Sequence, residues 1–522
     1  MSRPPSDLVT RLWARDSSLW SEEDKVQSAI SDRLGWLDSP QWLAGNHERL
    51  TRWAAEIRAR GFSRAVLVGM GGSSLAAEVL VEVFASASDG LSLTVLDNTH
   101  PDAVRAALQH QSWARILFIF SSKSGTTAEV QALCAWVLEN LEEQGVAEPG
   151  SQCIAITDPG SPLAHLALQC HFHDCLLNPS DLGGRFSALT TFAMAPAALA
   201  GIGLGPLETS ATAMAQHCRG EEPKDNPGLA LGFWLAKQYQ GGRDCLELCI
   251  DDRLAPLAGW IEQLVAESTG KQGKGILPLA SARQAAPPGR LARIAIGVTE
   301  DTFFWQGIDA LANENVPLQC IELASNADLG GEFFRWTFAV AVTSALLGIN
   351  PFDEPDVNAS KQVTRDLLAG ELPTEAATTP LLAGLVPCLR DAPADSYLAI
   401  LAYAPPDPAV QDALDDFAQV VRDEYGLPVS ISTGPRYLHS TGQLHKGGPV
   451  RGIFLFVRIL PERDLSIFCE DFSLAELNQA QADGDRVVLM QQGRPVFSVD
   501  ITGAGQAGAR QLREKLFASL RS

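Results

Sequence analysis

Short apolar segments alternate with amphipathic, helix-length segments along most of this chain, and this alternation constrains its fold more than any other feature. Strands that alternate with helices form parallel sheets whose two faces are covered by helices. The sequence therefore predicts an α/β protein. The predicted buried strands are Ala65–Val68, Leu93–Leu96, Ile116–Phe120, Cys153–Thr157, Leu246–Ile250, Ile294–Val298, Gln319–Leu323, Leu398–Ala402, Val429–Ser432 and Ile453–Val457.

The same pattern divides the chain into four predicted parts. The first part is rich in tryptophan and helically periodic, so it predicts a packing cap. The last part begins after the loop around Leu372–Thr379. In it, Val487–Leu489 and Val496–Val499 flank Gln492-Gly493 and predict a β-hairpin before a C-terminal helix. The predicted parts are a helical cap (1–60), a first domain (61–240), a second domain (241–370) and a further C-terminal α/β unit (371–522).

One predicted strand ends in an unusually polar loop. Phe118–Phe120 closes a buried strand, and Ser121–Thr127 leads directly into the amphipathic helix that Glu129 opens. The free N–H groups and the positive end of a helix N-terminus favour an anion, above all a phosphate. An ordinary Ser/Thr N-cap is the alternative. Five hydroxyl side chains with a lysine exceed what capping needs, so we favour a phosphate-binding loop.

Two glycine-rich turns add to this picture. Gly69–Ser74 follows a strand and opens a helix, and its glycines allow close approach of a ligand. It partly resembles a dinucleotide fingerprint, with Asp97 where a ribose-binding acid could lie. Ser74 replaces the last glycine of that fingerprint, so the serines suit a sugar or its phosphate better. In the second turn, Asp181–Ser187, Arg185 could stabilise oxyanion charge or form a structural ion pair.

The composition narrows the choice of partners. A formal net charge of −22 argues against nucleic acid and anionic membranes, which both reward basic patches. An anionic substrate then needs a local positive site, which Lys123 and Arg185 could provide. No apolar run reaches bilayer length and no secretory signal is visible, so we expect a cytoplasmic protein. The ten scattered cysteines predict buried thiols, not a disulfide framework.

A candidate general base lies on the predicted helix that ends at Gly270. Gln263 and Glu267 are four residues apart and therefore share one helical face. The unfavourable dipole at the C-terminal end of the helix is expected to raise the pKa of Glu267 toward the working range of a base. A solvated glutamate capped by Lys271 is the alternative, and periodicity alone leaves the two readings even.

Two further residues have chemistry that suits proton transfer. Lys361 follows the acidic stretch Asn350–Ser360, and His439 lies in a short loop beside hydroxyl side chains. Either residue taken alone is more typical of a surface group. The stretch His171–Cys175 has metal-like residues, but alternating residues on a strand without a distant partner cluster make a weak site. We therefore predict no metal.

Taken together, these motifs resemble phosphoglucose isomerase. The resemblance spans about Arg11 to Lys361 in sequence order and includes the motif around His439. It is closest to the isomerase half of fused transaldolase–phosphoglucose isomerase proteins, without the transaldolase half. The family fold implies two sugar-isomerase (SIS) domains, each a flavodoxin-like parallel sheet sandwiched by helices.

The resemblance also implies roles for individual residues. It implies that Ser122, Lys123, Ser124 and Thr127 form a phosphate loop, with Ser73 nearby. It implies that Glu267 is the base, with Gln263 beside it, and that Arg185, with the adjoining Gly184, steadies an enediolate. His439 and Lys361 are then the two groups that open the sugar ring.

Two departures from the family pattern stand out. Around Lys361 the usual Asp-Gln-Pro-Gly-Val-Glu is replaced at Glu354, Asp356 and Asn358. The ring-opening histidine usually lies between the base and the lysine motif, and in many relatives it comes from the neighbouring subunit. Here His439 follows Lys361. Either an additional α/β unit has taken over its position or His439 is structural, and the dependence on a dimer stays open.

The resemblance implies interconversion of glucose 6-phosphate and fructose 6-phosphate through a cis-enediolate, with no metal or organic cofactor. It implies a homodimer as one arrangement and a functional link to a separate transaldolase. Two alternatives remain. A non-catalytic SIS sensor would keep the phosphate loop without needing Glu267 or Lys361. A nicotinamide-dependent oxidoreductase would use Gly69–Ser74 and Asp97.

Overall fold

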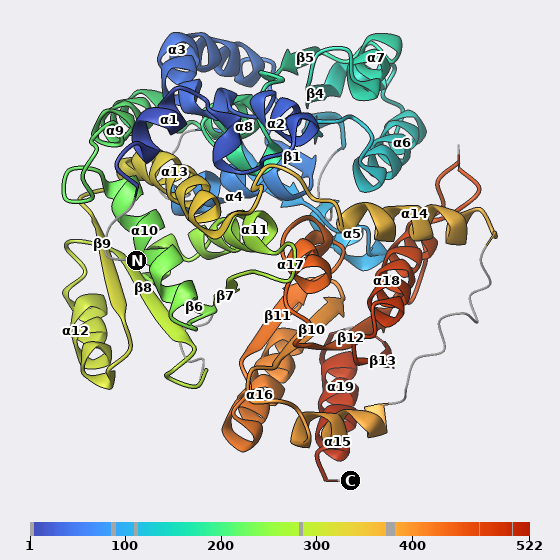
Figure 1. The fold of residues 1–522 in the computed structure, drawn as a ribbon. Helices are drawn as coiled ribbons and strands as arrows, with labels where there is room; N and C mark the ends of the chain where they lie inside the picture. Colours follow the sequence, from blue (N-terminus) through green and yellow to red (C-terminus); the bar gives the residue numbers. More distant parts are fainter. Residues whose placement is uncertain are drawn as a thin grey trace.

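Three parallel β-sheets, each flanked by helices, form the framework of the chain (Figure 1). They are seen in a computed structural model that describes residues 5–84, 90–108, 113–280, 286–371, 382–468, 470–503 and 505–521. Every strand pair within the sheets is parallel. The predicted α/β class is therefore confirmed. The loop 372–379, where we placed the start of the last part, lies outside the described residues.

The first sheet has the strand order β2-β1-β3-β4-β5. Gly69 at the end of β1 pairs with Ser121 at the end of β3, so both polar loops leave the same edge of the sheet. The strand order reverses between these two strands, which is where open α/β sheets bind ligands. The strands are β1 (Arg64–Gly69), β2 (Ser92–Leu96), β3 (Ile116–Ser121), β4 (Cys153–Thr157) and β5 (Asp174–Leu177).

The second and third sheets repeat this order over four strands each, β7-β6-β8-β9 and β11-β10-β12-β13. The third unit is therefore built on the same plan as the first two. The strands are β6 (Cys245–Ile250), β7 (Leu277–Leu279), β8 (Leu291–Val298), β9 (Leu318–Leu323), β10 (Tyr397–Tyr403), β11 (Val429–Thr433), β12 (Gly452–Leu460) and β13 (Val496–Thr502).

Helices of the first two units share one large apolar core with the N-terminal helices. This part of the chain contains α1 (Leu8–Trp13), α2 (Asp24–Ser31), α3 (Ser39–Arg58), α4 (Leu75–Val83), α5 (Pro101–Leu108), α6 (Ala128–Glu143), α7 (Pro162–Gln169), α8 (Thr191–Leu199), α9 (Leu204–His217), α10 (Pro227–Gln240), α11 (Leu257–Thr269), α12 (Thr302–Leu311) and α13 (Leu329–Leu347).

The third unit packs against the first two at the centre of the molecule, where α11, α14 and α17 lie close together (Figure 1). One apolar cluster joins residues of the second and third sheets, including Leu277 and Tyr397. The remaining helices are α14 (Val357–Leu368), α15 (Leu385–Arg390), α16 (Pro408–Tyr425), α17 (Gly442–Gly447), α18 (Leu474–Gln491) and α19 (Gly505–Ser519).

The predicted hairpin is wrong. Val487–Leu489 belongs to the last turns of α18, and Val496 begins β13, which pairs in parallel with β12. Ser473 and Glu476 start α18 with a reciprocal capping box, which satisfies free N–H groups of the first turn. Gln492-Gly493 is therefore the turn between a helix and a strand. Val488 and Leu489 are buried residues of that helix and form no strand.

Two other expectations concern the whole chain. The nine cysteines in the described part are all unpaired. Five of them are buried as predicted, but Cys170, Cys175 and Cys388 are partly exposed and Cys320 is exposed, so the prediction of buried thiols is only partly right. Within the described segments, no helix has both the length and the apolar character that a bilayer crossing requires.

Candidate active site

The two polar loops of the first sheet lie against each other. Ser121 Oγ donates a hydrogen bond of 2.8 Å to the carbonyl oxygen of Ser73, which fixes the loop after β1 to the end of β3. Ser122 Oγ lies 2.8 Å from Thr127 Oγ1 and accepts from the N–H of Gly125 at 3.1 Å. The predicted phosphate loop is thus folded into a compact turn of hydroxyl groups.

Thr127 is the residue that precedes α6, but its side chain forms no cap hydrogen bond. Ser124 Oγ is likewise turned to its neighbour Thr126, at 2.9 Å between the two hydroxyl oxygens. The alternative reading of this loop as an ordinary N-cap therefore does not describe its geometry. The hydroxyl groups surround the N-terminal end of a long helix without capping it, which suits an anion.

Lys123 is held at the side of this loop. Its ammonium group forms an ion pair with Asp158 and donates to the carbonyl oxygen of Ser180 at 3.3 Å. Desolvation raises the pKa of Asp158, while Lys123 opposes that shift. The charge of Lys123 is therefore partly neutralised before any anion binds. The hydroxyl and backbone N–H groups of the loop are more available than this ammonium group as hydrogen-bond donors to an anion.

Arg185 is the most heavily bonded of the predicted site residues. It is 5% exposed, and its Nε donates to Ser268 Oγ at 3.0 Å. One terminal nitrogen donates to backbone carbonyl oxygens, including that of Asp353 at 2.8 Å. The other lies 3.2 Å from both Glu267 and Glu354. These contacts fix the guanidinium plane, so Arg185 can present a fixed positive charge.

Backbone contacts bring Arg185 to the loop after β1. A Cβ atom on Gly72 would lie 2.2 Å from the carbonyl carbon of Gly184 and 2.7 Å from the nitrogen of Arg185, so only glycine fits there. A Cβ atom on Gly184 would meet nothing within 4 Å. The space into which a side chain at Gly184 would point is thus open.

Glu267 is buried in the last turn of α11 and is 7% exposed. Burial raises the pKa of this carboxyl group, Arg185 opposes the shift, and the nearby charge of Glu354 adds to it. The predicted direction is right, although burial is the main cause where we expected the helix dipole. Lys271 does not cap Glu267; its ammonium group binds Asp353 at 2.9 Å. The reading of Glu267 as a solvated glutamate is therefore wrong.

Gln263 connects Glu267 to the third unit. Its Nε2 donates to Glu267 Oε2 at 3.1 Å and to the carbonyl oxygen of His439 at 2.7 Å. Its buried Oε1 has no hydrogen-bond partner in the described part of the chain. Gly71, with a φ of 52°, lies so close that a Cβ atom there would be 2.7 Å from Gln263 Nε2. An unpaired buried acceptor lacks a donor, and a ligand hydroxyl group such as that of a sugar is one group that could supply it.

His439 lies at this same place, after the end of β11. Its Nε2 donates to Glu129 Oε1 at 2.9 Å, and Gln481 Nε2 donates to the same oxygen at 2.6 Å. Burial alone would raise the pKa of Glu129, but the charges of His439 and Lys361 lower it instead. We did not predict Glu129. It is separated from His439 by 310 residues, so no local spacing could have paired them.

Lys361 is exposed, unlike the buried site residues Arg185, Gln263 and Glu267. It lies on α14, and its charge acts on both Glu129 and Glu354. The structure therefore brings predicted site residues of all three units together: Ser73 and the phosphate loop from the first, Glu267 and Gln263 from the second, and His439 from the third. Lys361 acts there through its charge, while Lys123 and Ser124 are bonded to residues of the first unit.

Asp97, the acid on which a dinucleotide site would depend, is already engaged. Arg436 Nη1 lies 3.0 Å from Asp97, and the same guanidinium group is bonded to Glu78. Asp97 thus connects the first sheet to the third unit. This arrangement disfavours a ribose hydroxyl as its partner.

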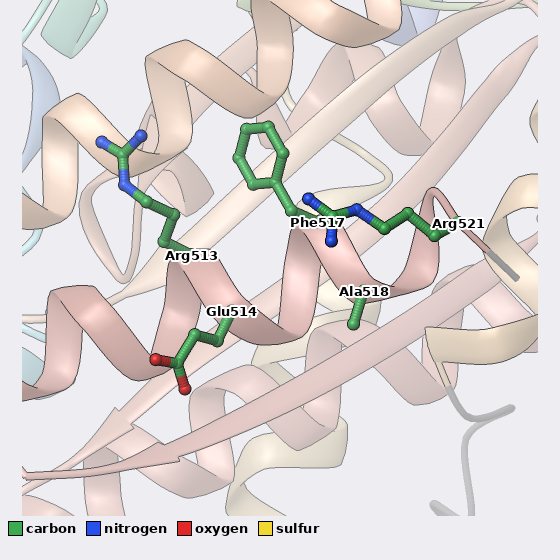
Figure 2. A pocket seen from close by; sticks show the side chains of 5 residues that line it. All are labelled: Arg513, Glu514, Phe517, Ala518 and Arg521. Carbon is green, nitrogen blue, oxygen red and sulfur yellow. The ribbon is translucent and has the colours of Figure 1, made fainter.

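A hollow of about 370 Å³ lies elsewhere, on α19 (Figure 2). Its lining side chains come from this helix and from the residues directly after it, and they carry none of the predicted chemistry. They are Arg513, Glu514, Phe517, Ala518 and Arg521. We therefore place the candidate site at the junction of the three units and not at this surface.

Tandem parallel sheets of this order, with a hydroxyl-rich loop at the switch point, define a doubly wound, flavodoxin-like α/β fold. Residues 51–277 match the family model described as phosphoglucose isomerase, which confirms the resemblance over this part of the chain. The matched part includes the phosphate loop, Arg185, Gln263 and Glu267. Lys361 and His439 lie beyond it.

Individual proteins agree with this result. A glucose-6-phosphate isomerase of Citrifermentans bemidjiense is 27% identical over 351 residues, which cover 59% of this chain and 66% of that protein. Another, of Gloeothece citriformis, is 32% identical over 275 residues, which cover 51% of this chain and 49% of that protein. The chain thus spans between half and two thirds of the length of these curated relatives.

The fold extends further than the sequence similarity. A hypothetical protein of Thermus thermophilus, known from its crystal structure, superposes with a TM-score of 0.60 at 22% identity. The superposition covers 70% of this chain and 94% of that one. It shows that the two proteins share a fold over that part of the chain.

Proposed function

We propose that this chain is an aldose–ketose isomerase that interconverts glucose 6-phosphate and fructose 6-phosphate. One observation supports the proposal above others: Glu267 is buried beside the fixed guanidinium group of Arg185, at 3.2 Å, and next to the unpaired Oε1 of Gln263. A buried carboxylate with a raised pKa, an adjacent cation and an unpaired acceptor suit proton transfer next to a carbonyl group.

In the proposed reaction the sugar ring first opens, and the open-chain aldose binds with C1 and C2 beside Glu267. The carboxylate takes the proton from C2, the C2–H electrons form a C1–C2 double bond, and O1 becomes negatively charged. Arg185 stabilises that charge. The carboxyl proton then returns to C1, while the hydroxyl proton on O2 moves to O1, which leaves a ketone at C2.

The phosphate would bind at the other end of the site. Ser122, Ser124 and Thr127 offer hydroxyl groups at the N-terminus of α6, with Ser73 in the facing loop. Lys123 contributes long-range attraction, since Asp158 already pairs with its ammonium group. This local positive site would allow a chain of net charge −22 to bind an anionic sugar.

A coupled assay on fructose 6-phosphate tests the proposal. Glucose 6-phosphate formation is followed through a dehydrogenase that reduces NADP. We expect turnover by the wild-type chain and a strong loss in His439→Ala, because the imidazole group that faces Glu129 would be missing. Binding without turnover in the wild type would indicate a sensor instead, and quenching of NADH fluorescence would indicate the oxidoreductase.

Glu354→Gln is expected to lower the pKa of Glu267, because it removes a nearby negative charge. It also removes the carboxylate that competes with Glu267 for the ion pair with Arg185. The base must be ionised, so activity falls as the pH drops through the pKa of Glu267. The acid limb of kcat/KM should therefore move to lower pH. Glu314→Gln, which alters a glutamate paired with Arg293, should leave the limb in place. An unmoved or higher limb in Glu354→Gln would contradict the assignment.

Three finer points are retained as proposals. The resemblance implies a homodimer and a functional link to a separate transaldolase, and the sequence pattern leads us to expect a cytoplasmic location. The contacts that join Glu129, Glu267 and His439 are all made within one chain. We therefore propose that dimer formation is not needed to complete the site.

A further inference from the structure

Three polar side chains form a buried stripe along α18. Asn478, Gln481 and Asp485 are separated by three and four residues, so they lie on one face of the helix. All three are buried, and Asp485 has no exposed surface. Burying polar groups costs free energy unless each of them is hydrogen-bonded. The identity of their partners therefore shows what this face of the helix contacts.

Gln481 is linked to the histidine of the candidate site through the carboxylate of Glu129. Its Nε2 donates to Glu129 Oε1 at 2.6 Å, the same oxygen that accepts from His439 Nε2 at 2.9 Å. At the other end of the Gln481 amide, Thr99 Oγ1 donates to Oε1 at 3.3 Å and itself accepts from Asn478 Nδ2 at 3.1 Å. The amide is therefore bonded at both ends, and this fixes the Glu129 carboxylate in turn.

Asp485 accepts hydrogen bonds from both segments that carry the proposed ring-opening groups. Tyr437, two residues before His439, donates its hydroxyl proton to Asp485 Oδ2 at 2.7 Å. Ser360, directly before Lys361, donates to Oδ1 at 2.9 Å. The ammonium group of Lys446 lies 2.5 Å from Oδ1 and supplies the balancing charge. One carboxylate thus joins α14, α17 and the turn before His439.

We propose that Gln481 and Asp485 of α18 are positioning residues that hold His439 and Lys361 for the opening of the sugar ring. This inference rests on the proposed function. Ring opening of glucose 6-phosphate breaks the C1–O5 bond, delivers a proton to O5 and removes the O1 hydroxyl proton as the C1 carbonyl forms. With Nε2 donating to Glu129, Nδ1 of His439 is the ring nitrogen that exchanges a proton with the sugar.

Figure 1 shows why this task falls to α18. The helix packs along α14, which carries Lys361, and is part of the unit that supplies His439. Fully bonded polar networks in a buried environment are rigid. The face of α18 therefore sets the distance between Lys361 and His439, which lie 78 residues apart in the sequence.

The test uses Gln481→Met, which keeps the length of the side chain and removes its donor to Glu129. The readout is the primary isotope effect on kcat with glucose 6-phosphate that is deuterated at C2. The variant is made in a Glu267→Asp background, where transfer of the C2 proton limits turnover. We expect kcat to fall a further tenfold to hundredfold, roughly the rate equivalent of one hydrogen bond to a charged group. The isotope effect should fall toward one, because ring opening becomes the slow step.

Tyr437→Phe and Ser360→Ala provide a second test, this time of the contacts of Asp485. Each removes one hydrogen bond to Asp485 and leaves the Lys446–Asp485 pair in place. Both should lower the isotope effect in the same background, while an acyclic sugar-acid phosphate binds as it does to the parent. Ser473→Ala removes the cap of α18 instead, so it should lower the melting temperature without changing kcat or the isotope effect.

An undiminished isotope effect in Gln481→Met and in both Asp485-contact variants would overturn the inference. Parallel losses of kcat and of binding of the acyclic compound would also overturn it, since they indicate a purely structural role. A wild-type chain without isomerase turnover would instead overturn the proposed function, on which this inference rests.

Discussion

Glu267→Gln is expected to lower kcat for fructose 6-phosphate by about 10²–10⁴-fold, the range that a positioned general base contributes. The amide has the same shape as the carboxylate but cannot take the proton from carbon. The change also removes one of the two carboxylates on Arg185 and leaves Glu354 at 3.2 Å to balance its charge. The coupled isomerase assay measures this loss.

The folded structure and the phosphate site should survive this substitution. Far-UV circular dichroism is expected to match the wild type, and an equilibrium titration should show sugar phosphate still binding. The matched comparison is Lys123→Ala combined with Thr127→Ala, which removes the charge and one hydroxyl group of the loop and should abolish binding. If Glu267→Gln kept wild-type turnover, the assignment of the base would be wrong.

The strands were predictable because their signal is local. Each buried strand is a short apolar run between polar loops, and Ile116–Phe120 or Cys153–Thr157 lies within one residue of the observed strand. The phosphate loop was predictable for the same reason, since its hydroxyl groups are contiguous. The fold class therefore followed from patterns that a window of about ten residues contains.

Errors arose where a short apolar run could belong to either kind of element. Val487–Leu489 reads as a strand by itself, but it ends a helix that begins at the capping box of Ser473 and Glu476. That box is visible in the sequence and could have corrected the hairpin. Periodicity alone does not separate a short strand from the end of a helix.

The chemistry of the site was less accessible, because it depends on contacts between distant parts of the chain. The pKa of Glu267 is raised mainly by burial, which the sequence of its own helix does not specify. The bond between His439 and Glu129 joins the third unit to the first. Glu354 stood out as a departure from the family pattern, and its contact with Arg185 gives that departure a physical consequence.

Lys446→Met is expected to lower the free energy of unfolding by about 3–5 kcal/mol, the cost of leaving one partner of a buried ion pair alone. Both side chains of the Lys446–Asp485 pair have no exposed surface. Removing the ammonium group leaves the Asp485 carboxylate with only the hydroxyl groups of Ser360 and Tyr437. Urea denaturation followed by far-UV circular dichroism measures the loss. An unchanged midpoint would contradict it.

A double variant separates charge from packing. Asp485→Asn in the Lys446→Met background removes the unpaired charge and should recover part of the lost stability. The eleven tryptophans all lie at or before Trp336, so their fluorescence reports the first two units. One apolar cluster joins the second and third sheets, so we expect the fluorescence transition to shift together with the circular dichroism. A shift in circular dichroism alone would show that the third unit unfolds separately. The unit that carries His439 would then be held at the site by surface contacts, and not by a shared core.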